Sequence, residues 1–258
     1  MFCKIELLPK KDIEEEEAKD LIWTFLASLY SNGQILKDYK FIKEKNYTLY
    51  VTLPKHDSLD EKYDGIYVKR DRKALYELYD TVVTPLGENM ESSGYCECAS
   101  RSAMEMVTYN MDIDSVFVCC DCGKSVALYE LPFPSDYIKD YWQINAWQED
   151  YSSMDMLWMH SLFDRYTGNQ RVKYDSVLNK SGIEKAEDMS KKLGYPIYYH
   201  LADDYGNSIK SEQVGDMEIH ICPKCGKLMK KITIPPNSEI DICEECHLSY
   251  NAYKKTKN

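Results

Sequence analysis

Four cysteines in the last part of the chain have the types and spacing of a metal site. Cys222-Pro-Lys-Cys225-Gly and Cys243-Glu-Glu-Cys246-His are CxxC motifs separated by 17 residues. A CxxC turn directs two thiolates toward one point, and a short β-hairpin between the motifs would bring the two turns face to face. Four soft thiolates in a tetrahedron are the ligands of structural zinc and leave no open coordination position. This C-terminal cluster predicts a zinc ribbon; a pair of disulfides is the alternative.

A second group of cysteines, the upstream cluster, has a weaker pattern. Cys96-Glu-Cys98 is followed after 20 residues by Cys119-Cys-Asp-Cys122-Gly-Lys, which repeats the CxxC-Gly-Lys sequence of residues 222–227. We therefore expect a second zinc site formed by Cys96, Cys98, Cys119 and Cys122, with Cys120 directed elsewhere. A buried thiol cluster and a redox pair are the alternatives.

The use of cysteine also bears on the compartment. The first 11 residues lack the apolar segment of a signal peptide, and no apolar stretch approaches the ~20 residues of a membrane helix. CxxC pairs in a chain without a secretion signal are typical of metal ligands in a reducing compartment. We expect a cytoplasmic protein.

The charge of the chain is unevenly distributed. The formal net charge is −11, yet residues 222–258 carry seven Lys against four Asp or Glu, so the remainder is strongly acidic. An acidic surface repels phosphates, whereas charge complementarity favours a basic protein partner. Negative charge that only maintains solubility is the alternative interpretation.

The elements that position the cysteines begin with a predicted β-α-β-β arrangement. Residues 2–8 predict a strand, and an apolar stripe at residues 18–29 predicts a helix that ends at Asn32-Gly33. Residues 41–44 and 47–53 predict a hairpin. Such a unit resembles half of a ferredoxin-like α/β sandwich.

The middle of the chain predicts mixed structure. Residues 72–79 predict a short helix, and residues 81–125 predict irregular β structure around the upstream cluster. An apolar stripe at 144–162 predicts an amphipathic helix. A second helix is predicted from Ser181, whose capping box is completed by Glu184, to Gly194. A tyrosine-rich strand at 195–201 follows.

These elements define the expected fold. We expect an α+β protein with an N-terminal ferredoxin-like sandwich, a central Cys-rich β and helical region, and a C-terminal four-cysteine zinc ribbon. The predicted body spans residues 1–215 and contains the metal site at residues 96–122. The predicted ribbon spans residues 216–258.

Motifs for catalysis are absent from the sequence. It contains no Gly-rich phosphate loop, no HExxH helix and no Gly-x-Ser-x-Gly elbow. No HxE motif precedes the CxxC pairs as it does in zinc deaminases. We expect a non-enzymatic protein; an enzyme that uses the upstream cluster as a catalytic metal site is the remaining alternative.

The first functional hypothesis is therefore a zinc-binding protein that docks to another protein. One concrete form is an immunity-type or regulatory factor that occludes a basic toxin or nuclease. Tyr and Trp are frequent anchors of such interfaces. The candidate anchors, unless they belong to the core, are Trp142, Trp147, Trp158, Tyr195, Tyr198 and Tyr199.

The second hypothesis is a zinc ribbon that binds nucleic acid. Lysines of the ribbon would contact phosphates, and Tyr250 or Tyr253 would stack on bases. The candidate lysines are Lys224, Lys227, Lys230, Lys231, Lys254, Lys255 and Lys257.

Several segments carry a resemblance to a known family. They are residues 29–36, Cys96-Glu-Cys98, residues 122–132, residues 194–199 and the two CxxC motifs of the C-terminal cluster. In these segments, which span nearly the whole chain in one order, the sequence resembles a bacterial family of unknown function. That family is described as zinc-ribbon-containing, with nucleic-acid binding as a suggested role. The resemblance implies that the ribbon cysteines are shared metal ligands, and it implies no catalytic residue. The acidic body departs from what nucleic-acid binding requires.

Overall fold

Two units share the chain, and their segments alternate along the sequence. The computed structural model describes residues 1–90, 92, 94–203, 210–214 and 217–252. The N-terminal unit comprises residues 1–95, 113–115 and 126–142, and the C-terminal unit comprises residues 96–112, 116–125 and 143–258. This division differs from the boundary that the sequence analysis placed at residue 216. The segment from residue 217 belongs to a larger unit because its last described strand pairs with a strand far upstream.

The N-terminal unit is built on one antiparallel sheet with the strand order β2-β3-β1-β4. Alternate residues of β1 (Cys3, Ile5 and Leu7) are buried, as expected for a strand with one face on a core. Its elements are β1 (Phe2–Pro9), α1 (Glu15–Ser31), β2 (Lys40–Lys43), β3 (Tyr47–Thr52), a 3₁₀ turn (Glu61–Tyr63), α2 (Ile66–Leu78), β4 (Tyr79–Gly87) and a 3₁₀ turn (Leu128–Glu130).

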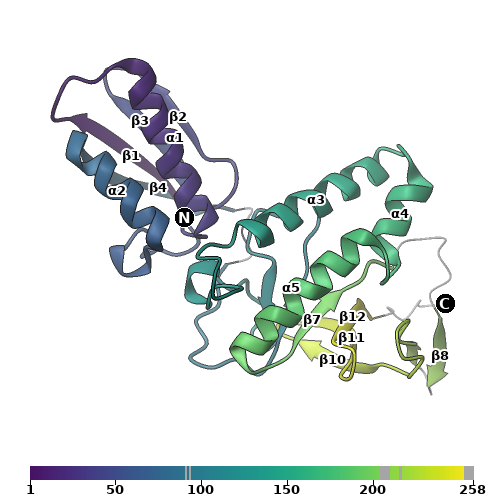
Figure 1. Cartoon of the computed structure of the whole chain (residues 1–258). Coiled ribbons are helices and arrows are strands. Elements are labelled where there is room, and N and C mark those ends of the chain that lie inside the picture. Colours follow the sequence, from purple (N-terminus) through teal and green to yellow (C-terminus); the bar gives the residue numbers. More distant parts are fainter. Residues whose placement is uncertain (91, 93, 204–209, 215–216, 253–258) are drawn as a thin grey trace. The chain divides into compact units, whose positions relative to one another are not determined.

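Helices α1 and α2 lie side by side and cover one face of this sheet (Figure 1). Acidic residues occupy the first turn of α1, where the helix dipole favours negative charge. The predicted helix end is confirmed: Asn32 follows the last turn, and Gly33 adopts a φ of 73°. The apolar core between helices and sheet includes Ile22, Leu26 and Leu49, each fully buried. The predicted helix at residues 72–79 is longer than expected and begins at Ile66.

A buried polar network fixes the loop before α2. Arg72 donates to both carboxylate oxygens of Asp64, at 2.6 and 2.8 Å, and both side chains are almost fully buried. Gln34 donates to Asp64 at 3.0 Å and to the carbonyl of Ser58 at 2.9 Å. Asn32 donates to Gln34 at 2.9 Å. Gln34, which follows α1, therefore stabilises the loop that contains Ser58 and Asp64, about 30 positions later in the chain. Each buried polar group of this network has a hydrogen-bond partner.

The C-terminal unit is built on a mixed sheet, the central sheet, with the strand order β10-β11-β12-β7-β5-β6. Strand β7 pairs in parallel with both β5 and β12, and the remaining pairs are antiparallel. Its strands are β5 (Met104–Met106), β6 (Phe117–Cys119), β7 (Ile197–His200), β10 (Lys230–Ile234), β11 (Ser238–Cys243) and β12 (Leu248–Asn251). A separate hairpin pairs β8 (Ser211–Val214) with β9 (Met217–His220).

Three helices complete the C-terminal unit: α3 (Trp142–Met159), α4 (Asp164–Val172) and α5 (Val177–Leu193). Figure 1 shows α5 crossing over β7. The two pack so closely that a Cβ atom on Gly182 would lie 2.2 Å from the ring of Tyr199 and 2.7 Å from Nε1 of Trp147. Only glycine therefore fits at this contact.

The predicted start of α5 is wrong, because the helix begins more than one turn earlier than the sequence analysis placed it. Ser176, not Ser181, is the N-cap, and its hydroxyl accepts a hydrogen bond from the amide of Asn179 at 3.1 Å. The earlier start buries Leu178 and Asn179. The predicted end is confirmed, because Gly194 takes the left-handed conformation with a φ of 79°. Helix α3 ends at Met159, so Leu162 of the predicted stripe lies beyond it and is exposed.

The structure confirms a mixed α+β protein with several sheets. An irregular segment at residues 94–125 surrounds the upstream cluster, as expected, with β5 and β6 as its named strands. Among the described residues, no helix combines the length and apolar character needed to cross a bilayer.

Candidate metal centres

The three CxxC knuckles share one local fold. In each knuckle the amide that follows the second cysteine donates to the carbonyl of the first: Gly123 to Cys119 at 2.8 Å, and Gly226 to Cys222 at 2.9 Å. Gly123 and Gly226 have φ values of 71° and 74°, a left-handed backbone that glycine adopts without strain. In addition, the amide of Cys119 donates to the carbonyl of Lys124, and the amide of Cys222 donates to the carbonyl of Lys227. The repeated CxxC-Gly-Lys sequence thus specifies the same turn twice.

The third knuckle replaces glycine with histidine. His247 donates its amide to the carbonyl of Cys243 at 2.8 Å and has a φ of 51°. Its ring lies perpendicular to that of Tyr198, with 5.9 Å between the ring centroids, and its carbonyl accepts the amide of Tyr199 at 2.8 Å. These contacts with β7 hold the left-handed residue in place and join the knuckle to the central sheet.

The C-terminal cluster brings together the four cysteines that its motifs predict. The first knuckle lies between β9 and β10, and the second lies between β11 and β12. The four sulfur atoms all lie within 4.8 Å of one another, and Sγ of Cys225 is 3.7 Å from Sγ of Cys243. A tetrahedral zinc site with Zn–S bonds of about 2.3 Å requires S···S separations of about 3.8 Å. The donors therefore fit a four-coordinate zinc ion.

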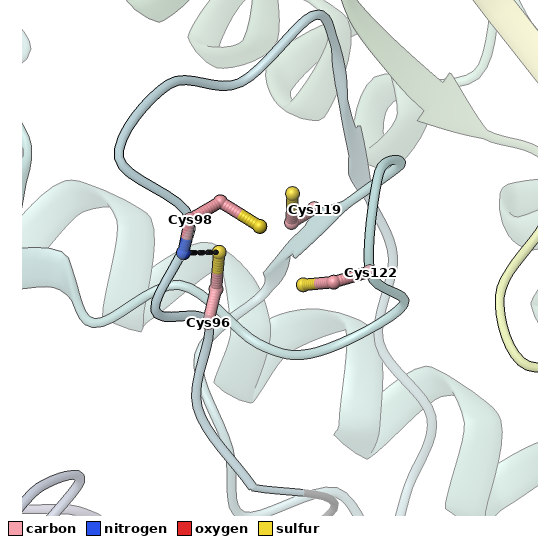
Figure 2. A group of neighbouring side chains, drawn as sticks. All are labelled: Cys96, Cys98, Cys119 and Cys122. Carbon is pink, nitrogen blue, oxygen red and sulfur yellow. Dashed lines mark hydrogen bonds between the residues drawn. The ribbon is translucent and has the colours of Figure 1, made fainter.

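The upstream cluster has the same donor set in a less regular frame. The sulfur atoms of Cys96, Cys98, Cys119 and Cys122 all lie within 4.8 Å of one another. Figure 2 shows the four side chains grouped around one space, with the amide of Cys98 directed at Sγ of Cys96. That distance is 3.4 Å. Cys96 and Cys119 are buried, whereas Cys98 and Cys122 are half-buried.

Burial favours the protonated form of several thiols in both clusters. Burial raises the pKa of Cys119 and Cys246, and raises that of Cys222 to about 11. Four thiolates this close would repel one another, whereas a divalent ion would hold them deprotonated. Because all ten cysteines are free thiols, the disulfide alternative finds no support. Each cluster could hold one metal ion, and no other such group occurs among the residues described.

One thiol in each cluster has a lowered pKa. Burial opposes ionisation of Cys96, but Arg101, whose Nε lies 3.4 Å from Sγ, and the amide of Cys98 lower its pKa to about 7. The amide of Lys227 lowers the pKa of Cys225. Sequence reasoning missed Arg101; its only signal was an arginine three positions after a CxC pair.

Cys120 lies outside the upstream cluster. It is partly buried against an apolar cluster that includes Ala103, Tyr198 and Ile234. Burial raises its pKa to about 12, because the charged form is poorly solvated there.

The six aromatic residues predicted as partner anchors do not form one surface. Trp147, Tyr198 and Tyr199 are buried in the C-terminal unit and belong to its core. Trp158 is half-buried beneath the guanidinium of Arg171, which lies 4.4 Å from the ring centroid. Tyr195 is also half-buried, and Trp142 remains exposed at 56%.

The lysines predicted to contact phosphates are ion-paired where the structure describes them. Lys227 pairs with Glu245, and Lys230 pairs with Glu244 at 2.8 Å. Lys231 lies 3.6 Å from buried Asp241, and Lys224 lies 4.0 Å from Glu187. Lys254, Lys255, Lys257 and Tyr253 lie outside the described residues. Tyr250 is 2% exposed and stacks on His220, so it is not available to a base.

Comparison with known proteins identifies two domains of unknown function. The family model of one, DUF2310, matches residues 98–202, and that of the other, DUF8589, matches residues 1–83. The first match includes three cysteines of the upstream cluster and ends before the C-terminal cluster. The matches therefore do not themselves establish the zinc ribbon that the resemblance implies.

Two relatives come from Haemophilus influenzae, and both are described as uncharacterized proteins. One is 32% identical over 189 residues, which cover 70% of this chain and 68% of the relative. The chain belongs to the same family as this protein. The other is 31% identical over 81 residues, which cover 31% of this chain and 37% of the relative.

One solved structure, that of Rv0793 from Mycobacterium tuberculosis, aligns with a TM-score of 0.27 at 17% identity. The alignment covers 34% of this chain and 95% of that one. A similarity this low does not bear on function.

Proposed function

We propose that this protein is a non-enzymatic zinc-binding protein with two structural four-thiolate sites. The observation that carries the proposal is the convergence of four sulfur atoms, all within 4.8 Å of one another, in each of two clusters. Four thiolates fill the tetrahedral positions of zinc, so the ion would stabilise structure and would present no open position to a substrate. The C-terminal cluster is formed by two knuckles that the hairpin of β10 and β11 connects. With zinc bound, this arrangement would be a zinc ribbon.

Metal analysis of the purified protein tests this proposal. We expect about two zinc ions per chain, retained through gel filtration in buffer without added metal. The double variants Cys225→Ser/Cys246→Ser and Cys98→Ser/Cys122→Ser should each retain one. Cys120→Ser is the matched control, because Cys120 lies outside both clusters, and it should retain two. A wild-type protein that is free of metal and takes up no added zinc contradicts the proposal.

We further propose that the protein acts by docking to a basic protein. One concrete form of this proposal is that the protein is an immunity-type or regulatory factor that occludes a basic toxin or nuclease. The net charge of −11 supports this partner chemistry. Support for a surface comes from the apolar corner between α3 and α4. Its exposed side chains are Met156, Met159, Leu162, Phe163 and Tyr166. Phe163 is 76% exposed and has a φ of 58°, an uncommon backbone conformation for a bulky residue.

Affinity capture with quantitative mass spectrometry tests the docking proposal. The bait is wild-type protein beside Leu162→Ser/Phe163→Ser and a control, Met111→Ser, which replaces another exposed methionine. We expect a basic protein that is retained by wild type and control and lost with the corner variant. Its measured Kd should weaken at least about tenfold in that variant, as for interface anchors, and should weaken as salt screens the charges. Equal retention by all three baits contradicts this surface.

The nucleic-acid alternative is weakened because the four described candidate lysines already face carboxylates. A gel-shift titration at about 50 mM and 200 mM salt distinguishes the two hypotheses, because phosphate contacts weaken steeply with salt. No shift at the lower salt concentration would exclude nucleic acid.

Two finer assignments complete the proposal. The strand order β2-β3-β1-β4, with two helices on one face, supports a ferredoxin-like sandwich for the N-terminal unit. The grouping of eight cysteines as two sets of possible metal ligands supports residence in a reducing compartment, for which we propose the cytoplasm.

A further inference from the structure

The two cysteine clusters are attached to one sheet. The upstream knuckle at residues 119–122 follows β6, and the second C-terminal knuckle at 243–246 connects β11 to β12. Strands β5 and β7 lie between them in the order β12-β7-β5-β6. Movement of either knuckle would therefore be transmitted to strands that support the other.

A second, direct contact joins the clusters. The hairpin of β10 and β11 has a C-terminal knuckle at each of its two ends, and its tip at Pro235 lies on the upstream knuckle. A Cβ atom on Gly123 would lie 1.8 Å from the carbonyl oxygen of Pro235 and 3.4 Å from Cγ2 of Ile234. Gly123 is thus required twice, for its left-handed backbone and for the approach of the hairpin tip.

The hairpin also shares an apolar cluster with residues that flank the upstream ligands. Ile234, Ile240 and Ile242 are buried with Ala103 and Tyr198, and Cys120 packs against the same cluster. Cys120 lies between two upstream ligands in the sequence, and its amide donates to the carbonyl of Ala103 at 3.1 Å. Displacement of the hairpin would expose this cluster to water and would leave the upstream knuckle without support.

We propose that the two four-cysteine sites bind zinc with positive cooperativity, through the hairpin of β10 and β11. The inference rests on the proposed zinc binding. Metal at the C-terminal cluster closes the base of the hairpin and thereby places its tip on Gly123. Metal at the upstream cluster fixes the knuckle that receives the tip. Each ion orders a surface that the other site needs, so occupancy of one site raises affinity at the second, and linkage makes the effect reciprocal.

Zinc affinity at one site, measured with and without the other, tests the proposal. Metal-free protein competes with a chromophoric chelator for zinc, in wild type and in the two double serine variants that each retain one site. We expect the upstream site of Cys225→Ser/Cys246→Ser to bind zinc about 5- to 150-fold more weakly than in wild type, the usual range of coupling between sites. Cys98→Ser/Cys122→Ser should weaken the C-terminal site by the same factor. Unchanged affinity at the remaining site in either variant overturns the proposal.

A variant that keeps all eight cysteine ligands distinguishes coupling between the sites from misfolding of a ligand variant. Ile234→Ala removes the side-chain contact of the hairpin with the upstream knuckle and with the shared apolar cluster. Met189→Ala, which is also buried and lies on α5, is the matched control. Zinc-loaded proteins are challenged with chelator, and the cysteines set free are alkylated and mapped by mass spectrometry. We expect alkylation at residues 96–122 to be several-fold faster in Ile234→Ala than in the control. Equal rates overturn the coupling, whereas failure of wild type to hold any zinc would overturn the zinc-binding proposal itself.

Discussion

The N-terminal unit and the hairpin of the C-terminal unit are held together by different forces. The N-terminal sheet and its helices enclose a large apolar cluster, whereas the cluster beneath the hairpin contains five buried residues among those described. A large apolar core supplies stability from burial alone. The hairpin buries far less and instead has a four-thiolate set at its base. The comparison indicates that one part of the chain folds by burial, whereas the proposed metal would supply much of the stability of the other.

The largest effect in this comparison should come from removing metal. Structural zinc typically contributes about 10–16 kcal/mol to the fold of a small domain. We therefore expect a strong chelator to release two zinc ions and to abolish hydrogen-exchange protection in β10, β11 and β12. The amides of β1 and β3 should keep their protection, because their core contains no predicted metal ligand. Uniform loss of protection in both units, or no loss in either, would contradict the different roles assigned to burial and metal in the two parts.

A smaller effect is expected from Arg72→Ala in the N-terminal unit. The change leaves the Asp64 carboxylate buried without its ion-pair partner, which typically costs about 3–5 kcal/mol. Urea unfolding measures the loss, and zinc content should stay at two per chain. Lys43→Ala is the control, since Lys43 and its ion-pair partner Glu15 are both exposed and the pair should contribute about 0–1 kcal/mol. Loss of zinc in Arg72→Ala would show that the two parts are not independent.

Arg101→Ala should act on metal affinity and leave the N-terminal unit unchanged. Hydrogen-bond partners of metal ligands typically contribute about 10- to 100-fold to affinity, and Arg101 donates to Sγ of Cys96. Competition with a chelator should show this loss at the upstream cluster. Arg165→Ala removes an exposed arginine of α4 and should leave affinity unchanged. If the two variants bind zinc equally, the guanidinium has no such role.

The smallest effect concerns the helical layer, which neither metal nor the N-terminal core supports. Ser176→Ala removes the observed N-cap of α5 and should lower the free energy of unfolding by about 1 kcal/mol. Ser181→Ala, at the position that the sequence suggested, should change it by less than about 0.5 kcal/mol. Thermal or urea denaturation of the two variants decides which serine begins the helix.

The cysteine clusters could be predicted because the sequence patterns that specify them are local. A CxxC turn and its following glycine specify the geometry of two sulfurs within a few residues, and the structure shows the same hydrogen bonds at residues 119–124 and 222–227. The ends of α1 and α5 were predictable for the same reason, since Asn32-Gly33 and Gly194 provide the backbone that ends a helix.

Long-range features could not be read in this way. The parallel pairing of β7 with β12 joins residues about 50 positions apart, and no local pattern specifies it. Without that pairing, the segment after residue 216 looks like a separate ribbon. Likewise, Asp64 and Arg72 gave no signal of burial, because charged residues in a polar stretch usually indicate solvent exposure. The start of α5 was misplaced because Glu184 imitates a capping box, while burial of Leu178 extends the helix upstream.

The position of β12 within the central sheet has a consequence for synthesis of the protein. Residues 248–251 fill an interior place between β11 and β7, although they form the last of the described strands. On the ribosome, one edge of β7 therefore keeps open hydrogen-bonding groups until residues 248–251, about 50 positions later in the chain, have emerged. Such open edges favour pairing with other chains. Nascent chains stalled before residue 248 should for this reason be the form most prone to aggregate.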